Sequence, residues 1–459
     1  MPSSEPRSQR CNADWSLNSC QIQPMPFVPK WMSSVVLLLA LFTLPIQRGH
    51  SESTKLEASY IVLDEQGMVA RTILTNAAQC PTINLDGNSQ QMNVRASPGG
   101  IERFPDLVCE FFIPAGTNIA TIKGQALPLL QPTLGSIAVL GDSGCRLRAV
   151  KFDPTDADWD DGKFQDCNIG TRWPFSVLAK SVAAARPDLV IHVGDYLYRE
   201  SPCSKNDRGC AGSPYGDNWT TWKADFFTPA APLLRVAPWI MVRGNHEICK
   251  RAGTGYFRYL HPTLAQSQAA LPCLDMVPFY TVKVSDQSFV ILDSSDAADT
   301  CPKEGCKSAL YVEQFSSMSP AAGAWLVTHR PIWGLKNKNV RLNATLQAAL
   351  ARWDGRLPPG FTLVVAGHIH LWEVLSFADQ RSPQFVLGNS GTLLAHKIKQ
   401  PLIGQQIQNA TISFGRSEHE WGYTLFRRGA DETNWTATYY GINGDPKFSC
   451  RVSATAVSC

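Results

Sequence analysis

The 459-residue sequence has no strong excess of charge of either sign. Its 42 Lys and Arg residues face 39 Asp and Glu residues, which gives a formal net charge of +3. We find no basic stripe interleaved with aromatic residues, so a nucleic-acid partner is not expected. The absence of repeats and of long heptad runs excludes collagen and coiled-coil classes. With 44% hydrophobic and 18% charged residues, the chain has enough apolar material for a packed core.

Long hydrophobic runs are also missing, and the one marked apolar stretch covers only residues 35–44. A bilayer-spanning helix needs roughly 20 apolar residues, so this stretch better fits the apolar region of a secretory signal peptide, with Lys30 as its positive flank. We therefore assign residues 1–52 to a leader or signal segment. We expect a secreted or periplasmic protein with no stable membrane span after leader removal. An uncleaved tether and a buried helix are the alternatives.

No Cys-x-x-Cys cluster of the kind that binds a metal occurs among the 14 cysteines. Apart from Cys11 and Cys20, they fall into near-neighbour couples: Cys80 with Cys109, Cys145 with Cys167, Cys203 with Cys210, Cys249 with Cys273, Cys301 with Cys306, and Cys450 with Cys459. An even count of local couples behind an export signal indicates structural disulfides. This pairing is one of many that twelve cysteines permit, so an oxidising compartment is the firmer expectation. Four glycosylation sequons, at Asn218, Asn343, Asn409 and Asn434, are compatible with exposed loops.

The pattern of apolar runs in the sequence changes near residue 134. Residues 56–133 hold short apolar runs separated by Gly, Pro and Asn, which predicts a small β-rich N-terminal domain. From residue 136, six buried-type strands are expected at 137–140, 189–193, 239–242, 289–292, 325–327 and 363–366. Helices are expected between them at about 174–185, 219–234 and 341–353. Strands that alternate with helices predict an α/β layer over residues 134–459, with active groups at the strand ends.

Polar residues follow five of these strands directly. They are Asp142, Asp195, Tyr198, Asn245, His246, His329, His368 and His370. Oxygen and imidazole donors without thiolate suit a metal such as Fe, Zn or Mn. Two buried aspartates are costly as bare anions, and a metal pair removes that penalty. Each motif alone has an ordinary explanation as a turn or a helix cap, but their joint occurrence at strand ends argues against coincidence.

The blocks Gly-Asp-Ser-Gly, Gly-Asp-x-x-Tyr, Gly-Asn-His-Glu, the histidine of Thr-His-Arg-Pro and Gly-His-x-His span residues 141–370. They resemble the five-block signature of calcineurin-like metallophosphoesterases and, more narrowly, that of purple acid phosphatases. The broader superfamily usually has a histidine where this chain has Gly144, and Tyr198 is placed to replace it. Leu326 stands where the family usually has valine, which is an apolar exchange within a strand. The resemblance implies a layered αββα metallophosphoesterase sandwich as the catalytic domain.

The resemblance also implies a dinuclear metal centre. Asp142, Tyr198 and His370 would bind Fe(III), since tyrosinate favours a ferric ion. Asn245, His329 and His368 would bind a divalent ion (Fe, Zn or Mn), and Asp195 would bridge the two. The implied function is a secreted phosphohydrolase that cleaves phosphate monoesters of small molecules by attack of a metal-bound hydroxide. His246 would act as a catalytic proton donor or phosphate-orienting group.

Several points stay open at this level. The same site could serve a phosphodiesterase or nucleotide hydrolase, and a non-enzymatic binding protein would be expected to lack some of the seven ligands. Glu247 either orients His246 or a ligand, or begins a helix. Arg199 and Arg330 either touch phosphate or form ion pairs. Trp219 and Trp222 belong either to the core or to a pocket. The sequence does not predict the oligomeric state.

Overall fold

A computed structural model of the chain describes residues 53–100, 103–149, 163–263, 272–337, 340–429 and 434–459. The leader expected at residues 1–52 lies outside the described residues. Residues 52–459 form one compact unit, which is the unit described below. Among the described residues, no helix is long and apolar enough to cross a bilayer.

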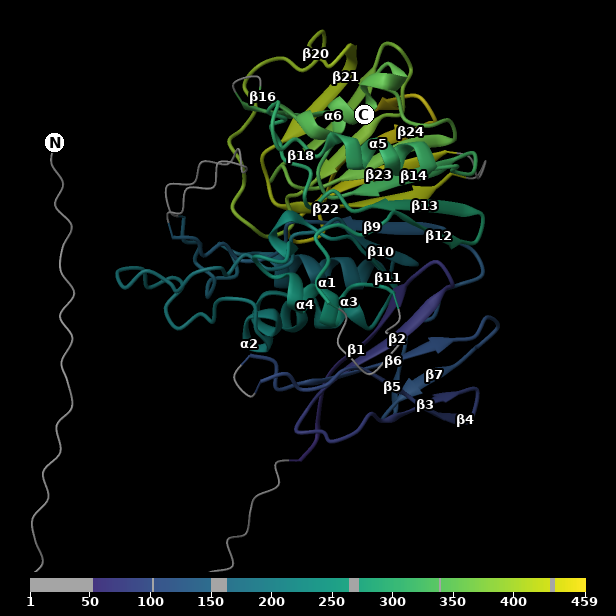
Figure 1. Cartoon of the computed structure of the whole chain (residues 1–459), viewed down its shortest axis with the longest axis vertical. Coiled ribbons are helices and arrows are strands. Elements are labelled where there is room, and N and C mark those ends of the chain that lie inside the picture. The colour runs from purple at the N-terminus through teal and green to yellow at the C-terminus, as the bar shows by residue number, and fades with distance from the viewer. Residues whose placement is uncertain (1–52, 101–102, 150–162, 264–271, 338–339, 430–433) are drawn as a thin grey trace, which may run out of the picture. The chain divides into compact units, whose positions relative to one another are not determined.

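Two large β-sheets dominate the unit (Figure 1). The first has 11 strands in the order β25-β24-β23-β22-β9-β10-β11-β1-β2-β6-β5. Its strands are β1 (Lys55–Leu63), β2 (Met68–Thr75), β5 (Asn93–Ala96), β6 (Leu107–Ile113), β9 (Ser136–Leu140), β10 (Leu189–His192), β11 (Trp239–Met241), β22 (Gly422–Arg428), β23 (Trp435–Gly441), β24 (Pro446–Val452) and β25 (Val457–Ser458). Strands β9, β10 and β11 are parallel, so their carboxyl ends meet at one edge.

The second sheet has 8 strands in the order β12-β13-β14-β17-β19-β18-β21-β20. Its strands are β12 (Tyr280–Val284), β13 (Gln287–Leu292), β14 (Ala324–Thr328), β17 (Phe361–Ala366), β18 (Trp372–Phe377), β19 (Gln384–Leu387), β20 (Gln406–Ile407) and β21 (Ala410–Glu418). Here β13, β14 and β17 run parallel. All six strands predicted between residues 137 and 366 are therefore present.

Helices cover the outer faces of the two sheets. They are α1 (Phe175–Ala185), α2 (Trp219–Trp222), the π-helical η1 (Lys223–Phe227), α3 (Thr228–Leu234), α4 (Gly253–Tyr259), α5 (Ser308–Ser317), α6 (Ala344–Leu350), and the 3₁₀ turns η2 (Asn245–Glu247) and η4 (Ala351–Trp353). Because side chains alternate along a strand, β9 and β10 give Val139 and Ile191 to the core between the sheets and Ala138 and Val190 to the core under the helices. A third core lies between the second sheet and α5 and α6. This arrangement confirms the expected αββα sandwich.

The helix predicted at residues 341–353 begins later than expected, at Ala344. Residues 340–342 form β16 (Val340–Leu342), which pairs with β15 (Gly334–Lys336). Asn343 then caps α6, because its side-chain oxygen accepts from the Leu346 backbone N–H. Asn343 is fully buried, so the expectation that its sequon lies on an exposed loop is wrong.

The N-terminal segment is β-rich, as predicted, and it belongs to the first sheet. Strand β1 pairs in parallel with β11, and β2, β6 and β5 continue the sheet outward. A small sheet in the order β4-β3-β7-β8 packs with it, built from β3 (Thr82–Leu85), β4 (Asn88–Gln91), β7 (Ala120–Ile122) and β8 (Gln125–Ala126). The boundary expected between residues 133 and 134 therefore does not separate two sheets, since backbone pairing crosses it.

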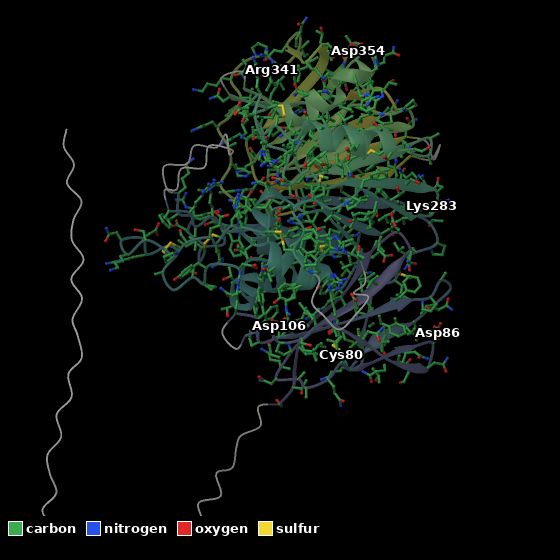
Figure 2. All side chains as sticks on the ribbon, in the orientation of Figure 1. Cys80, Asp86, Asp106, Lys283, Arg341 and Asp354 are labelled. Atoms are coloured by element: carbon green, nitrogen blue, oxygen red, sulfur yellow. A yellow bond between two sulfur atoms is a disulfide. The ribbon has the colours of Figure 1, made fainter. Side chains whose placement is uncertain are left out.

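Among the residues that the structure describes, six disulfides join near neighbours in the sequence. Figure 2 shows disulfides as yellow bonds. They are the six couples predicted above, from Cys80–Cys109 to Cys450–Cys459. Each closes a loop of at most 29 residues, so each fixes local structure rather than the docking of distant elements. Cys145–Cys167 lies in the loop that begins with Asp142.

Candidate active site

The residues singled out from the sequence come together where the carboxyl ends of the two sheets meet. Asp142 follows β9, Asp195 and Tyr198 follow β10, and Asn245 and His246 follow β11 in the first sheet. His329 follows β14, and His368 and His370 follow β17 in the second. All eight side chains are at most 6% exposed. The site is thus a buried seam between the sheets.

Backbone conformation turns the side chains into this seam. Asp142, Asp195 and His368 have positive φ angles of 54°, 60° and 69°, an unusual conformation that clusters at functional sites. The glycine before a site residue makes room for another one. A Cβ on Gly244 would lie 2.1 Å from Asp195 Oδ1, and one on Gly367 would lie 2.6 Å from Asp142 Oδ2. The repeated Gly-Asp, Gly-Asn and Gly-His pairs therefore have a packing cause.

The first group of donors surrounds the Tyr198 hydroxyl. That oxygen lies 3.0 Å from Asp142 Oδ1, 2.7 Å from Asp195 Oδ2 and 2.9 Å from His370 Nε2. His370 donates its other ring N–H to the Leu393 carbonyl at 2.9 Å, which leaves Nε2 as an acceptor. Three acceptors thus share the single proton of Tyr198.

The second group surrounds the Asn245 side-chain oxygen. His329 Nε2 lies 2.9 Å and His368 Nδ1 lies 2.8 Å from that oxygen. His329 donates Nδ1–H to the Val193 carbonyl at 2.7 Å, and His368 Nε2 lies 2.9 Å from Asp299 Oδ2. With their outer nitrogens protonated, both histidines present lone pairs to the amide oxygen. Three acceptors that converge without a proton are the arrangement that a cation satisfies.

The two groups share Asp195. Donor atoms of Asp142, Asp195 and His370 lie within 4.8 Å of one another, as do those of Asp195, His329 and His368. Burial and the Asp195 charge raise the pKa of Asp142 well above its usual range. Burial alone would also raise the pKa of Asp195, but the hydrogen bond from the His246 backbone N–H helps to hold it well below that range. Cations between the groups would let both carboxylates stay ionised, so the donor set fits a metal centre.

The site has no room for a side chain at Gly144. A Cβ at Gly144 would lie 2.7 Å from both Tyr196 O and Tyr198 N, so the position excludes a histidine side chain. The backbone of residues 196–198 runs against this glycine, and the Tyr198 hydroxyl reaches Asp142 from there. Burial and the charges of Asp142 and Asp195 raise the pKa of Tyr198 well above its usual value. Its tyrosinate form therefore requires a cation.

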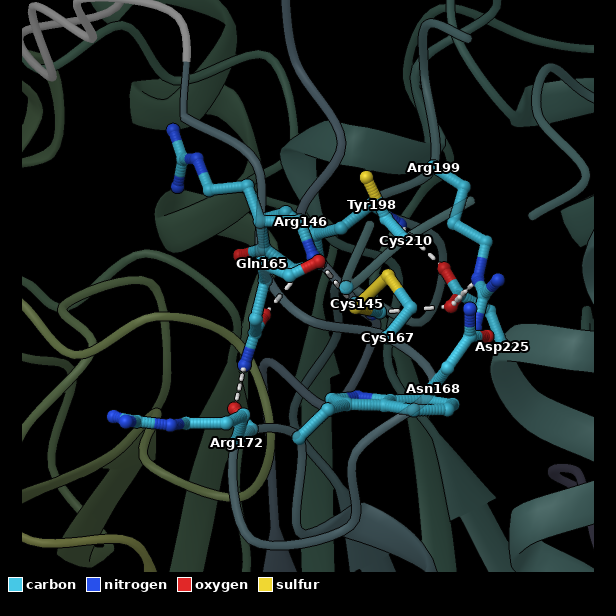
Figure 3. Close-up of a disulfide and its surroundings, with 12 residues drawn as sticks. Cys145, Arg146, Gln165, Cys167, Asn168, Arg172, Tyr198, Arg199, Cys210 and Asp225 are labelled. Atoms are coloured by element: carbon cyan, nitrogen blue, oxygen red, sulfur yellow. Dashed lines mark hydrogen bonds and ion pairs between the residues drawn. A yellow bond between two sulfur atoms is a disulfide. The ribbon is translucent and has the colours of Figure 1, made fainter. Parts of the chain in front are cut away.

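Asp225, on η1, ties the loops that carry Asp142 and Tyr198 together (Figure 3). It accepts from Cys145 N at 3.0 Å and Tyr198 N at 2.9 Å, and it pairs with Arg199. The Cys145–Cys167 disulfide anchors the same loop three residues after Asp142. Arg199 is therefore an ion-pair partner, which decides one alternative left open by the sequence.

His246 lies over the Tyr198 ring, with centroids 3.7 Å apart. Its Nδ1 lies 3.0 Å from Glu200 Oε1, and Arg251 Nη2 approaches its ring nitrogens at 2.9 and 3.0 Å. Burial, reinforced by Arg251, lowers the pKa of His246 to about 4. Glu247 does not contact His246 through its carboxylate.

The Glu247 carboxylate accepts backbone N–H groups from Gly244, Asp195, Tyr196 and Leu197. It also belongs to the 3₁₀ turn η2, so both readings of Glu247, as an orienting group and as the start of a helix, hold together. Burial and Asp195 raise its pKa to about 8. Glu247 thereby fixes the loop after β10 to the loop after β11.

Sequence reasoning missed Asp299, which lies behind His368. Its carboxylate accepts from Arg330 Nη1 at 2.8 Å and from Asn343 Nδ2 at 2.9 Å. Burial alone would raise the pKa of Asp299, but His368 and Arg330 hold it well below its usual range. Arg330 thus forms an ion pair, which is one of the two alternatives that the sequence left open. No local motif marks Asp299, which lies 69 residues from His368.

Trp219 and Trp222 lie in the core under the first sheet.

The chain matches a known protein family and resembles solved structures in its fold. The calcineurin-like phosphoesterase family model matches residues 135–371, which include every residue of both donor groups. No curated protein sequence matches the chain. The solved structures that resemble it include two at 12% identity: purple acid phosphatase PPD1 from seeds of yellow lupin (Lupinus luteus), and PhoD. The first has a TM-score of 0.52 and covers 86% of this chain and 74% of its own. PhoD has a TM-score of 0.50 and covers 89% and 91%. At that identity the likeness concerns the fold, and the family match identifies the chain as a member of the calcineurin-like phosphoesterase family and a metal-dependent phosphoesterase.

Proposed function

We propose that the chain is an exported, dinuclear-metal phosphohydrolase that acts on phosphate monoesters, similar to purple acid phosphatases. The observation that carries this proposal is the pair of donor groups that share Asp195. A single metal would need one of these groups, and the second would then leave buried acceptors unsatisfied. Six disulfides support export to an oxidising compartment.

Asp142, Tyr198 and His370 would hold one ion, which we propose is Fe(III). Asn245, His329 and His368 would hold a divalent Fe, Zn or Mn ion, and Asp195 would bind both. Bound ions would supply Lewis-acid stabilisation of phosphoryl charge and a water-derived nucleophile near neutral pH. Tyr198 supports the ferric assignment, because a phenolate oxygen prefers a hard, highly charged ion.

The protein's own residues hold this arrangement rigid before a substrate arrives. Val193, Leu393 and Asp299 fix the tautomers of the three histidines through the contacts given above. Asp225 and Glu247 hold the loops after β9, β10 and β11 by accepting backbone N–H groups. Such outer contacts raise the basicity of a histidine ligand and set its orientation.

His246 is placed to serve the leaving group. Its Nε2 lies 3.9 Å from Asp195 Oδ2, so it flanks the centre without belonging to either donor group. We propose that His246 donates a hydrogen bond to the phosphoryl group, whose negative charge favours the protonated ring, and protonates the leaving oxygen. Glu200 and Arg251 hold the ring in that position.

Metal content and the visible spectrum, measured on one purified and oxidised sample, test the proposal. We expect about two metals per chain, including iron, and a tyrosinate charge-transfer band. The sample should hydrolyse phenyl phosphate. Hydrolysis of bis(phenyl) phosphate without hydrolysis of the monoester would replace the monoester assignment with a phosphodiesterase. Two divalent ions and no colour would remove the ferric assignment.

A further inference from the structure

A cavity of about 420 Å³ opens beside the candidate metal centre. Its wall includes Arg148, Glu200, His246, Lys250 and Arg251. These residues come from the loops that follow β9, β10 and β11, so the cavity is built by the same loops as the centre. Its volume is at the lower end of the range for small-molecule sites, which fits a compact organic group rather than a folded partner.

His246 lines the cavity and also borders the candidate metal centre. One face of its ring packs on Tyr198, and Nε2 points toward Asp195. The side chains of Glu200 and Arg251 contact the same ring. A leaving group that is expelled past His246 therefore enters this cavity.

The wall carries more positive than negative charge. Arg148, Lys250 and Arg251 line it, against the carboxylates of Glu200 and Asp217. Asp217 is 8% exposed and accepts from Trp222 Nε1 at 2.9 Å and from Gly255 N at 3.1 Å. These donors do not line the cavity, so the negative charge of Asp217 is offset by hydrogen bonds from outside it.

Glu200 holds Arg251 and Arg148 in place, and its single negative charge can neutralise only one of their two positive charges. It pairs with Arg251 and lies 3.8 Å from Arg148 Nε. One carboxylate that holds two guanidinium groups orients their N–H donors, and Arg donors arranged in this way suit phosphate. Lys250 is exposed at the cavity and adds a third cation.

We propose that this cavity is a subsite for a second phosphate on the leaving group, so that the preferred substrates are small organic bisphosphates. This inference rests on the proposed phosphohydrolase function. The phosphoryl group to be cleaved would occupy the metal centre, and the second phosphate would meet Lys250 and the Glu200-held arginines. The P–O bond to the leaving oxygen breaks and water supplies the new oxygen on phosphorus. The two protons of that water end on the leaving oxygen, by way of His246, and on the released phosphate.

Two matched substrates test the subsite: propyl phosphate, and the bisphosphate of propane-1,3-diol. For the metal-loaded wild type we expect kcat/KM to be at least about tenfold higher for the bisphosphate. Lys250→Gln should lower this ratio about threefold, and Lys250→Glu should lower it further, since a single exposed charge contact has effects of this size. Lys283, an exposed residue on β12 (Figure 2), provides the control, and Lys283→Gln should leave the ratio unchanged.

Binding gives a second readout that does not depend on turnover. The ratio of Kd values for propylphosphonate and propane-1,3-diyl bisphosphonate should shift in the same way with each Lys250 variant. Hydrolysis of both esters with equal kcat/KM, or a ratio that Lys250→Glu leaves unchanged, overturns the subsite while the proposed function stands. Hydrolysis of neither ester overturns the proposed function and the subsite with it.

Discussion

Asp299→Asn is the sharpest probe of the proposed centre, because it changes one atom and leaves the shape of the side chain intact. In the wild type the Asp299 carboxylate accepts from His368 Nε2, while Arg330 Nη1 lies 3.1 Å from the same nitrogen. The negative charge of Asp299 favours a proton on Nε2. His368 Nδ1 then has its lone pair available for a metal.

The asparagine reverses this preference. Its oxygen is expected to take the Oδ1 position, where Arg330 and Asn343 both donate. Its amide then donates to His368 Nε2, as does Arg330, and the proton moves to Nδ1. A ligand nitrogen that carries a proton cannot bind the metal, so we expect affinity at that one position to fall roughly 10- to 100-fold.

Folding should suffer less than metal binding. Removal of a buried charge partner costs about 3–5 kcal/mol when nothing replaces it, but the asparagine oxygen still accepts from Arg330 and Asn343. We therefore expect a stability loss below about 3 kcal/mol. Asp286→Asn, at an exposed carboxylate that pairs with Arg428, is the matched control and should change neither quantity.

Equilibrium dialysis followed by elemental analysis measures the outcome, with a thermal melt as the check on folding. At a free divalent-metal concentration that just saturates the wild type, Asp299→Asn should retain about one metal per chain instead of two. A folded variant that keeps both metals with wild-type affinity would refute the tautomer reasoning and the assignment of His368.

Three further changes test other parts of the site and fold. Tyr198→Phe removes the proposed phenolate ligand, so the visible absorption should vanish while the far-ultraviolet circular dichroism stays the same; retained colour would contradict the assignment. His246→Ala should lower kcat roughly 10²- to 10⁴-fold with both metals still bound, and loss of metal would instead make His246 a ligand. Burial raises the pKa of Glu373 to about 8 from 4.5. The contribution of Glu373 to the stability of the wild type therefore falls as pH rises from about 4.5 to about 8, by up to roughly 5 kcal/mol in total. Glu373→Gln should raise Tm at pH 8.5 and not at pH 4.5, and an equal change at both pH values would count against a buried carboxyl.

The sequence predicted the buried strands and the motifs that lie at their ends. Runs such as 137–140 and 189–193 are continuous and apolar because both faces of the strand are buried, and the structure confirms them. The disulfide couples were readable for a similar reason, since each partner is close in sequence. The β-rich N-terminal segment was also predicted, but its place in the first sheet depends on the pairing of Val62 with Trp239, which no local pattern encodes.

The residues that position the site were not predicted, because their partners are far away in the sequence. Asp225 contacts Cys145 over 80 residues, and Asp299 contacts His368 over 69. Glu200 was overlooked beside Arg199, although it is the carboxylate that holds His246. A single acidic residue in a loop carries no signature until the fold supplies its neighbour.

The glycines show how a local motif and a long-range contact can be the same feature. A Cβ at Gly194 would lie 2.6 Å from His329 Nδ1, although Gly194 and His329 belong to different sheets. Each Gly-ligand pair therefore meets two requirements. The ligand follows a strand, and the glycine, which has no Cβ, leaves space for a residue from elsewhere in the chain. These two requirements explain why four of the five blocks begin with glycine. They also predict that Gly194→Ala would disturb both features at once, because φ at Gly194 is +99° and the added Cβ would meet His329 Nδ1 and the Gly244 backbone.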